Sequence, residues 1–265
     1  MRGIARDCVV EMFARKMFWI FAVITVIAII VIILSGNVEI GGTISGGQRM
    51  DVEDINEMLG NPIMRVYCSF VSFLVILTVL ATAGIVPGML IQGRAEYFLS
   101  KPISRTSFLL YKFFGMWLSY GILILICGGL GYGVMYLVHG VTADSMFFLF
   151  GLNLTSLFIW LSITVFAGVV FGSGTMAIIT AALVWFAQWL LQWHDYYRDV
   201  IDSEAVTGFI DVLYYIVPKT GELSDLTVRL ALGRPVGDWL PLYSSLIFAL
   251  VVLVAAVVIF NRKNY

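Results

Sequence analysis

The chain has 265 residues, of which 60% are hydrophobic and 12% charged, and its formal net charge is −1. A soluble globular domain carries about 25% charged residues, so this composition excludes an ordinary soluble domain and indicates an integral membrane protein. The near-zero charge gives no indication of nucleic-acid binding. The cysteines Cys8, Cys68 and Cys127 are scattered without a disulfide or metal-ligand spacing, so we expect no metal site on this chain.

Residues 1–16 predict an amphipathic helix that lies along the membrane surface before the first span. One stripe of this segment is apolar, and the opposite stripe is charged. The apolar stripe contains Ala5, Cys8, Val9, Met12 and Phe13, and the charged one Asp7, Glu11 and Arg15.

Six later runs lack Asp, Glu, Lys and Arg, and each is 19 to 27 residues long. About 20 apolar residues suffice for a helix to cross the hydrocarbon core. The sequence therefore predicts an all-α integral membrane protein, with six transmembrane helices in one domain covering residues 1–265. The predicted spans are Met17–Ser35, Val66–Leu90, Phe113–Val138, Ser145–Phe171, Thr175–Trp193 and Pro241–Phe260.

The charges between the spans predict the orientation. If both termini are cytoplasmic, the cytoplasmic parts hold ten of the sixteen basic residues and only three of the seventeen acidic ones. Basic residues accumulate in cytoplasmic loops, so this asymmetry favours both ends inside. The ten basic residues are Arg2, Arg6, Arg15, Lys16, Arg94, Lys101, Arg105, Lys112, Arg262 and Lys263.

The first outer loop, residues 36–65, is rich in glycine and then acidic. A cluster of acidic side chains lies between Asp51 and Glu57. A cation site is one interpretation, but the segment lacks the central glycine and distal glutamate of a calcium loop. We therefore expect a solvated acidic face.

Residues 91–112 form a basic segment between the second and third spans, with Arg94, Lys101, Arg105 and Lys112 against Glu96. A residue that precedes proline avoids the helical region, so Lys101 before Pro102 is expected to end one helix. Ser104 or Thr106 is then expected to cap the next helix. By charge alone this is a cytoplasmic loop that orients two membrane helices.

The order of residues in this segment resembles the G-x-x-E-x-L-L-S-K-P-x-S-R signature of ABC-2-type transporter permeases. The residues that carry the resemblance are Gly93, Glu96, Leu99, Ser100, Lys101, Pro102, Ile103, Ser104 and Arg105. In that family the segment is a coupling loop that docks into the ATP-hydrolysing subunit. The resemblance implies a separate cytoplasmic ABC ATPase as partner, and a homodimer or a heterodimer with a related permease. It also implies an amphipathic elbow helix at residues 1–16 and short outer helices before the last span.

Several glycines and one proline interrupt the predicted spans. Gly84, Pro87 and Gly88 predict a kink near the inner end of the second span, and Gly172, Ser173 and Gly174 must turn the chain between the fourth and fifth. The stripe Gly128, Gly129, Gly131 and Gly133 in the third span predicts either tight packing or a dimer face.

Gln188 and Gln192 lie four residues apart and share one face of the fifth span. Two interpretations stay open for them: they line a transport pathway, or they form hydrogen bonds to a neighbouring helix.

The outer segment 194–240 predicts two short helices. Val206, Phe209, Ile210, Leu213 and Val217 keep helical spacing up to Pro218. A second run contains Leu223, Leu226 and Leu230 and is interrupted by Gly233 and Pro235.

Residue types and motifs that the sequence lacks exclude several classes of function. The predicted spans contain no charge, which a proton- or ion-driven carrier needs, and no P-loop or intramembrane protease motif is present. Together with the resemblance, this predicts a non-enzymatic permease subunit of an ATP-driven exporter in the cell membrane. Cofactors are not expected on this chain, because ATP and Mg²⁺ belong to the partner ATPase. The alternative is a non-transporting membrane scaffold or anchor for an extracytoplasmic partner. A channel is disfavoured by the absence of a filter motif or charged ring.

Overall fold

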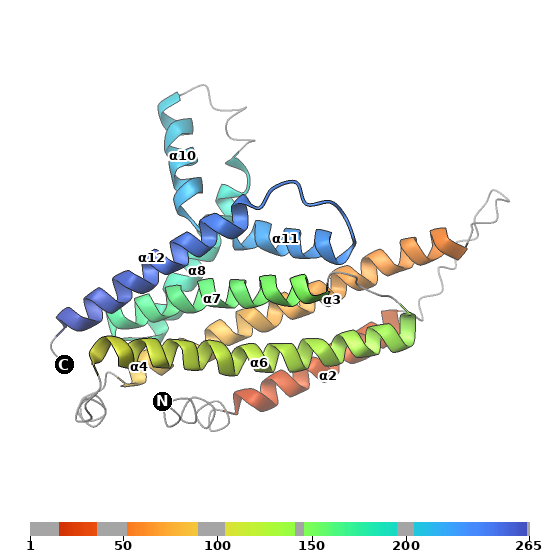
Figure 1. Cartoon of the computed structure of the whole chain (residues 1–265), viewed down its shortest axis with the longest axis horizontal. Coiled ribbons are helices and arrows are strands. Elements are labelled where there is room, and N and C mark those ends of the chain that lie inside the picture. Colours follow the sequence, from red (N-terminus) through yellow and green to blue (C-terminus); the bar gives the residue numbers. More distant parts are fainter. Residues whose placement is uncertain (1–15, 36–51, 90–103, 141–145, 195–203, 264–265) are drawn as a thin grey trace.

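The computed structural model describes residues 16–35, 52–89, 104–140, 146–194 and 204–263, and its regular secondary structure there is helical (Figure 1). The predicted surface helix 1–16 lies outside the described residues, except for Lys16. The helices are α2 (Met17–Ser35), α3 (Val52–Thr82), α4 (Ile85–Met89), α6 (Arg105–His139), α7 (Met146–Phe171), α8 (Gly174–Leu191), α10 (Glu204–Ile216), α11 (Thr220–Ala231) and α12 (Leu240–Arg262).

Six helical segments are long and apolar enough to cross a membrane, as the sequence predicts. They are α2, α3 continued by α4, α6, α7, α8 and α12. The chain is therefore an all-helical, multi-pass membrane protein.

Two of these helices are longer than the charge-free runs that they contain. The second spanning helix begins at Val52, so residues 52–65 are helical and not part of a loop. The third begins at Arg105, directly after Ser104, so residues 105–112 of the basic segment 91–112 are helical, as a cap at Ser104 predicts. The charge-free runs begin directly after Arg65 and Lys112, whereas the helical hydrogen bonding begins earlier in the chain. With 35 residues, α6 is about 52 Å long at 1.5 Å per residue.

The predicted helix breaks occur where glycines let two backbones meet. Ala83 and Gly84 separate α3 from α4, and Gly172, at φ +65°, ends α7. A Cβ atom on Gly174 would lie 2.9 Å from the Gly84 Cα atom. Only glycine allows this approach, so the two breaks pack directly against each other.

The glycine stripe of α6 serves packing within the chain. The Tyr67 hydroxyl of α3 donates a hydrogen bond to the Gly128 carbonyl over 2.9 Å. A Cβ on Gly131 would meet the Tyr67 and Phe70 rings at 3.3–3.4 Å, whereas Gly129 and Gly133 have no neighbour within 4 Å. The packing interpretation therefore holds at Gly128 and Gly131.

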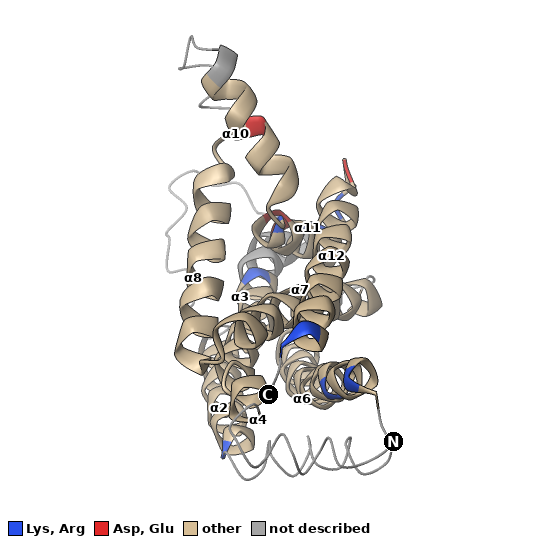
Figure 2. Cartoon of the chain, turned by 90° about the vertical axis from the view of Figure 1, so that its left-hand side faces the viewer, with Lys and Arg blue, Asp and Glu red and all other residues tan. Residues whose placement is uncertain are grey.

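Helix α7 is the centre of the bundle and contacts α3, α6, α8, α11 and α12. The short helix α11 also belongs to this bundle, because Leu223 and Leu226 are buried and α11 packs against α7 and α3. Both short helices predicted in segment 194–240 are present, as α10 and α11. Figure 2 shows Lys and Arg at the near ends of α6 and α12, and Asp and Glu around α10 and α11.

Candidate functional site

The first candidate site is the start of α6, where the segment that resembles the ABC-2 signature ends. Ser104 is the N-cap of α6, and its Oγ accepts a hydrogen bond from the Ser107 backbone N–H over 3.2 Å. Of the two caps that the sequence suggests, the structure uses Ser104. The other motif residues, Gly93, Glu96, Leu99, Ser100, Lys101, Pro102 and Ile103, lie outside the described residues.

Arg105, the first residue of α6, is bonded to the end of α12. Its Nη1 donates to the Lys263 carbonyl oxygen over 2.8 Å. One residue further along α6, the Thr106 hydroxyl accepts a hydrogen bond from Asn261 Nδ2, also over 2.8 Å. The first turn of α6 and the last turn of α12 are therefore held together by two polar contacts.

Lys263 extends this connection to α7. Its Nζ donates to the carbonyl oxygens of Val169 and Val170 over 2.8 and 2.7 Å. These carbonyls belong to the last turn of α7, where unpaired acceptors and the helix dipole favour a positive charge. We call this group of contacts the helix-end junction; its members are Arg105, Thr106, Val169, Val170, Asn261 and Lys263.

Lys112 differs from the sequence prediction. The sequence placed it at the end of the basic segment 91–112; in the structure it lies two turns inside α6 and is only 1% exposed. Lys112 directly precedes the charge-free run Phe113–Val138, so that run is unaffected, but α6 as a whole contains a buried lysine.

A second candidate site lies between α8, α10 and α11. Gln188 is 6% exposed and its Oε1 accepts a hydrogen bond from the Thr220 hydroxyl. Its Nε2 atom is buried and has no partner among the described residues. Gln192 is exposed, and its Nε2 occupies the space that a Cβ on residue 221 would need. Of the two interpretations that the sequence allows for Gln188, the structure therefore shows the second, a hydrogen bond to a neighbouring helix.

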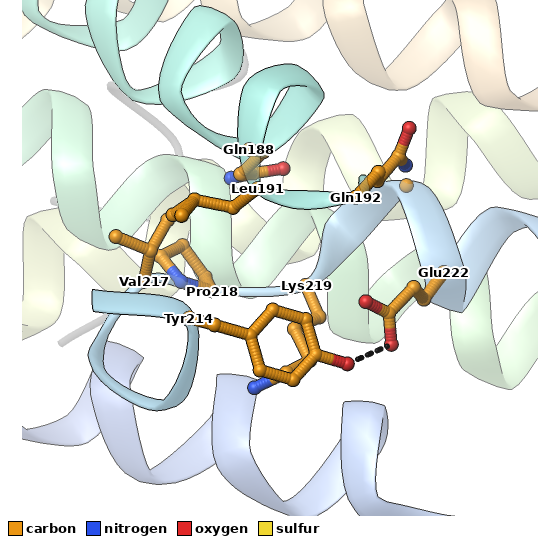
Figure 3. Close-up of a pocket in the computed structure, with 9 residues that line it drawn as sticks. Gln188, Leu191, Gln192, Tyr214, Val217, Pro218, Lys219 and Glu222 are labelled. Carbon is orange, nitrogen blue, oxygen red and sulfur yellow. Dashed lines mark hydrogen bonds between the residues drawn. The ribbon is translucent and has the colours of Figure 1, made fainter. Parts of the chain in front are cut away.

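Charged and aromatic side chains gather beside these amides (Figure 3). The Tyr214 hydroxyl donates to Glu222 Oε2 over 3.1 Å. Lys219 Nζ lies 4.2 Å from the centre of the Tyr214 ring, in a cation–π contact, and the His194 ring stacks on the same ring at 3.7 Å. The Lys219 backbone N–H donates to the Ser245 hydroxyl of α12 over 2.7 Å. Four segments of the chain therefore meet at Tyr214 and Lys219.

Burial determines the electrostatics of this cluster. Desolvation lowers the pKa of Lys219, and the Glu222 carboxylate acts against that shift. Desolvation raises the pKa of Glu222, while the Tyr214 hydroxyl and the Lys219 charge oppose the rise. Both shifts disfavour the charged form, so keeping the two charges in this cluster costs free energy at neutral pH.

The cavity that these residues line has a volume of about 10 Å³, which is enough for one water molecule. It is therefore a polar contact between helices and is too small to hold a transported molecule. Sequence reasoning missed Lys219 and Glu222, because a single lysine and a single glutamate in a polar segment give no local signal of burial.

No protein-family model matches this chain, and no curated protein sequence matches it either. The resemblance to ABC-2 permeases therefore depends on the order of residues 93–105.

Proposed function

We propose that the chain is the permease subunit of an ATP-driven ABC transporter of the ABC-2 type, acting as an exporter in the cell membrane. The residue order from Gly93 to Arg105 carries this proposal. Six helices capable of spanning a membrane are consistent with it. Both termini would be cytoplasmic, and two permease chains would assemble above two ATPase subunits.

The helix-end junction supports a mechanism for coupling. The proposed docking segment leads directly into α6, whose first residue, Arg105, is bonded to Lys263. Lys263 in turn caps the end of α7, the central helix of the bundle. A force that the ATPase applies to the segment would therefore reach α6, α12 and α7 together. The closing of the ATPase dimer would change how these helices pack.

The test compares two charge reversals in the full chain, purified from its native cell in mild detergent. Lys101→Glu places a negative charge within the proposed docking segment. Arg262→Glu reverses an exposed charge at the end of α12, outside the segment, and is the matched control. Arg105→Glu is less informative alone, because Arg105 also bonds Lys263.

We expect the unmodified chain and the Arg262→Glu variant to purify with a stoichiometric ATPase, and the Lys101→Glu variant to lose it. Thermal unfolding of each variant alone separates lost docking from lost folding. If no ATPase co-purifies with the unmodified chain, and a protein from the outer side is retained, the chain is a scaffold and the proposal is wrong.

A further inference from the structure

Three cavities follow one another along α3, from Arg65 at the end of the bundle away from Ser104 towards Leu80. The first, of about 520 Å³, is bordered by Arg65 of α3 and by Arg229 and Arg234. The second, of about 340 Å³, is bordered by Ser72 and Ile76, and the third, of about 280 Å³, by Ile76 and Leu80. The second and third also share Trp160 and Trp185, and the first and second share Asp225. Neighbouring cavities therefore adjoin each other, and we call the three together the cleft.

The chemistry of the lining changes along this cleft. Three arginines against one aspartate make the first cavity basic. The second is lined mainly by hydroxyl and amide side chains. The third is almost entirely apolar. The lining of the second cavity includes Ser72, Asn153, Ser156, Gln192, Thr220 and Ser224, and that of the third Val79, Leu80, Ile178, Ala181 and Ala182.

At the basic end of the cleft, the backbone conformation after α11 places Arg229 and Arg234 close together. Helix α11 ends at Ala231, and Gly233 follows in the left-handed region at φ +66°. The Arg234 N–H donates to the Arg229 carbonyl over 2.9 Å, and the Gly233 N–H to the Leu230 carbonyl over 3.1 Å. These are the two hydrogen bonds of a Schellman motif, which places Arg234 next to the last turn of α11.

The length of the cleft matches one leaflet of a bilayer. Arg65 to Ile76 is about 16 Å along a helix, and Arg65 to Leu80 about 22 Å. A bilayer with its headgroups is about 40–45 Å thick, so one leaflet measures about 20–22 Å. Arginines at the level of the headgroups and an apolar slot deeper in the leaflet correspond to the order of groups in a lipid molecule.

We propose that this cleft binds an anionic, phosphate-bearing lipid. The phosphate contacts Arg65, Arg229 and Arg234, the ester and hydroxyl region lies along the polar cavity, and an acyl chain enters the slot beside Trp185. Guanidinium groups pair with phosphate through charge-assisted hydrogen bonds, which gives the site its preference for an anionic headgroup. The proposal that the cleft binds a lipid does not depend on the proposed ATPase coupling. Only a role of the cleft as an entry point for transported molecules would depend on it.

The experiment uses the full chain in nanodiscs of phosphatidylcholine, with a small fraction of a photoreactive phosphatidylglycerol whose diazirine is on the acyl chain. Photoreactive phosphatidylcholine, at the same content, is the lipid control. The variant Arg229→Gln with Arg234→Gln removes two charges of the basic end, and Arg262→Gln at the far end of α12 is its control. Ala182→Phe fills the apolar slot, and Leu183→Phe is its control because Leu183 does not border the cleft.

We expect phosphatidylglycerol adducts on residues 72–80 and 178–185, with much weaker labelling by phosphatidylcholine. The double arginine variant should weaken binding tenfold or more, since a hydrogen bond to a charged group contributes about 1.5–3 kcal/mol. Ala182→Phe should abolish the adducts, and both controls should retain them.

Equal labelling by the two lipids, adducts spread evenly over other exposed helices such as α12, or no effect of either cleft variant would overturn the proposal. Displacement of the lipid by free glycerol phosphate would identify a soluble phosphate site instead. Cross-links from this cleft to a second copy of the chain would identify a dimer interface. No ATPase is present, so each of these results leaves the proposed permease function untouched.

Discussion

The Arg105 guanidinium donates a 2.8 Å hydrogen bond to the backbone carbonyl of Lys263, across 158 positions of sequence. The Lys263 ammonium group meanwhile bonds the last carbonyls of α7. One residue is thus an acceptor for the start of α6 and a donor to the end of α7. These contacts join the start of α6 and the ends of α7 and α12 at one residue.

The Lys263 side chain should contribute measurably to stability. Lys263→Ala removes both bonds to α7 and leaves the carbonyl that Arg105 uses. We expect the free energy of unfolding to fall by about 1.5–3 kcal/mol, the usual contribution of hydrogen bonds to a charged group. Reversible unfolding in mixed micelles, by titration with sodium dodecyl sulfate, measures this. Arg262→Ala, which removes an exposed neighbouring charge, should change little; equal losses in the two variants would contradict the assignment.

The close approach of Gly84 and Gly174 predicts a large effect of one methyl group. Gly174→Ala places a Cβ 2.9 Å from the Gly84 Cα, so the backbone must shift. We expect a loss of about 1–3 kcal/mol, as for overpacked cores. The matched control is Gly129→Ala in α6, where nothing lies within 4 Å. That variant should be neutral or stabilised by up to about 1 kcal/mol through helix propensity. The same unfolding titration compares both, and a neutral Gly174→Ala would disprove the contact.

Glu222 should make stability depend on pH. Burial raises its pKa above the ordinary value of 4.5, so the folded chain binds the extra proton between 4.5 and the raised value. The free energy of unfolding therefore rises as the pH falls through that window, and this contribution is lost again as the pH rises. The Glu222→Gln variant has no ionisable group at this position and therefore lacks this pH dependence. We expect the wild type to gain melting temperature relative to this variant as the pH is lowered from 7.5 to 4.5. Parallel melting curves for the two would rule out a raised pKa.

Tyr214 should control where that window lies. Its hydroxyl donates to the Glu222 carboxylate and thereby opposes the rise in pKa. Tyr214→Phe removes the hydroxyl and keeps the ring beneath Lys219, so the pKa of Glu222 should rise further. In the Tyr214→Phe variant, the pH at which the stabilising contribution of Glu222 is lost should therefore be higher than in the wild type. Tyr215→Phe should leave this pH unchanged. The same midpoint in both variants would mean that the hydroxyl has no electrostatic role.

The contact between Thr220 and Gln188 predicts a non-additive pair. Thr220→Val leaves both polar groups of the buried Gln188 amide without a partner among the residues that the structure describes, which should cost about 1–3 kcal/mol. Adding Gln188→Leu removes the unpaired amide. The double variant should therefore be more stable than the sum of the two single changes predicts. A double-mutant cycle in the unfolding titration measures this, and strict additivity would show that the two side chains do not interact.

The lengths of the spans show what hydropathy can and cannot predict. Charge-free runs located all six candidate spans, because crossing a bilayer needs a long apolar segment. They mark only the apolar parts of α3 and α6, from Val66 and Phe113, whereas the helices begin earlier, at Val52 and Arg105. For α6 the capping signal at Ser104 indicated the helix start. Proline and glycine were better guides to the ends of α7 and α10, since these residues act on the backbone directly.

By itself the sequence determined the all-helical membrane class, the six candidate spans, the cap at Ser104 as one of two choices, and the breaks at Gly84 and Gly172. These properties depend on the hydropathy and backbone preference of neighbouring residues. The tertiary structure alone decided that Arg105 meets Lys263, that Lys219 and Glu222 are drawn into one buried cluster, and that three arginines border a cleft along α3. Those relationships depend on which helix faces pack together, and no local pattern of residues encodes that choice.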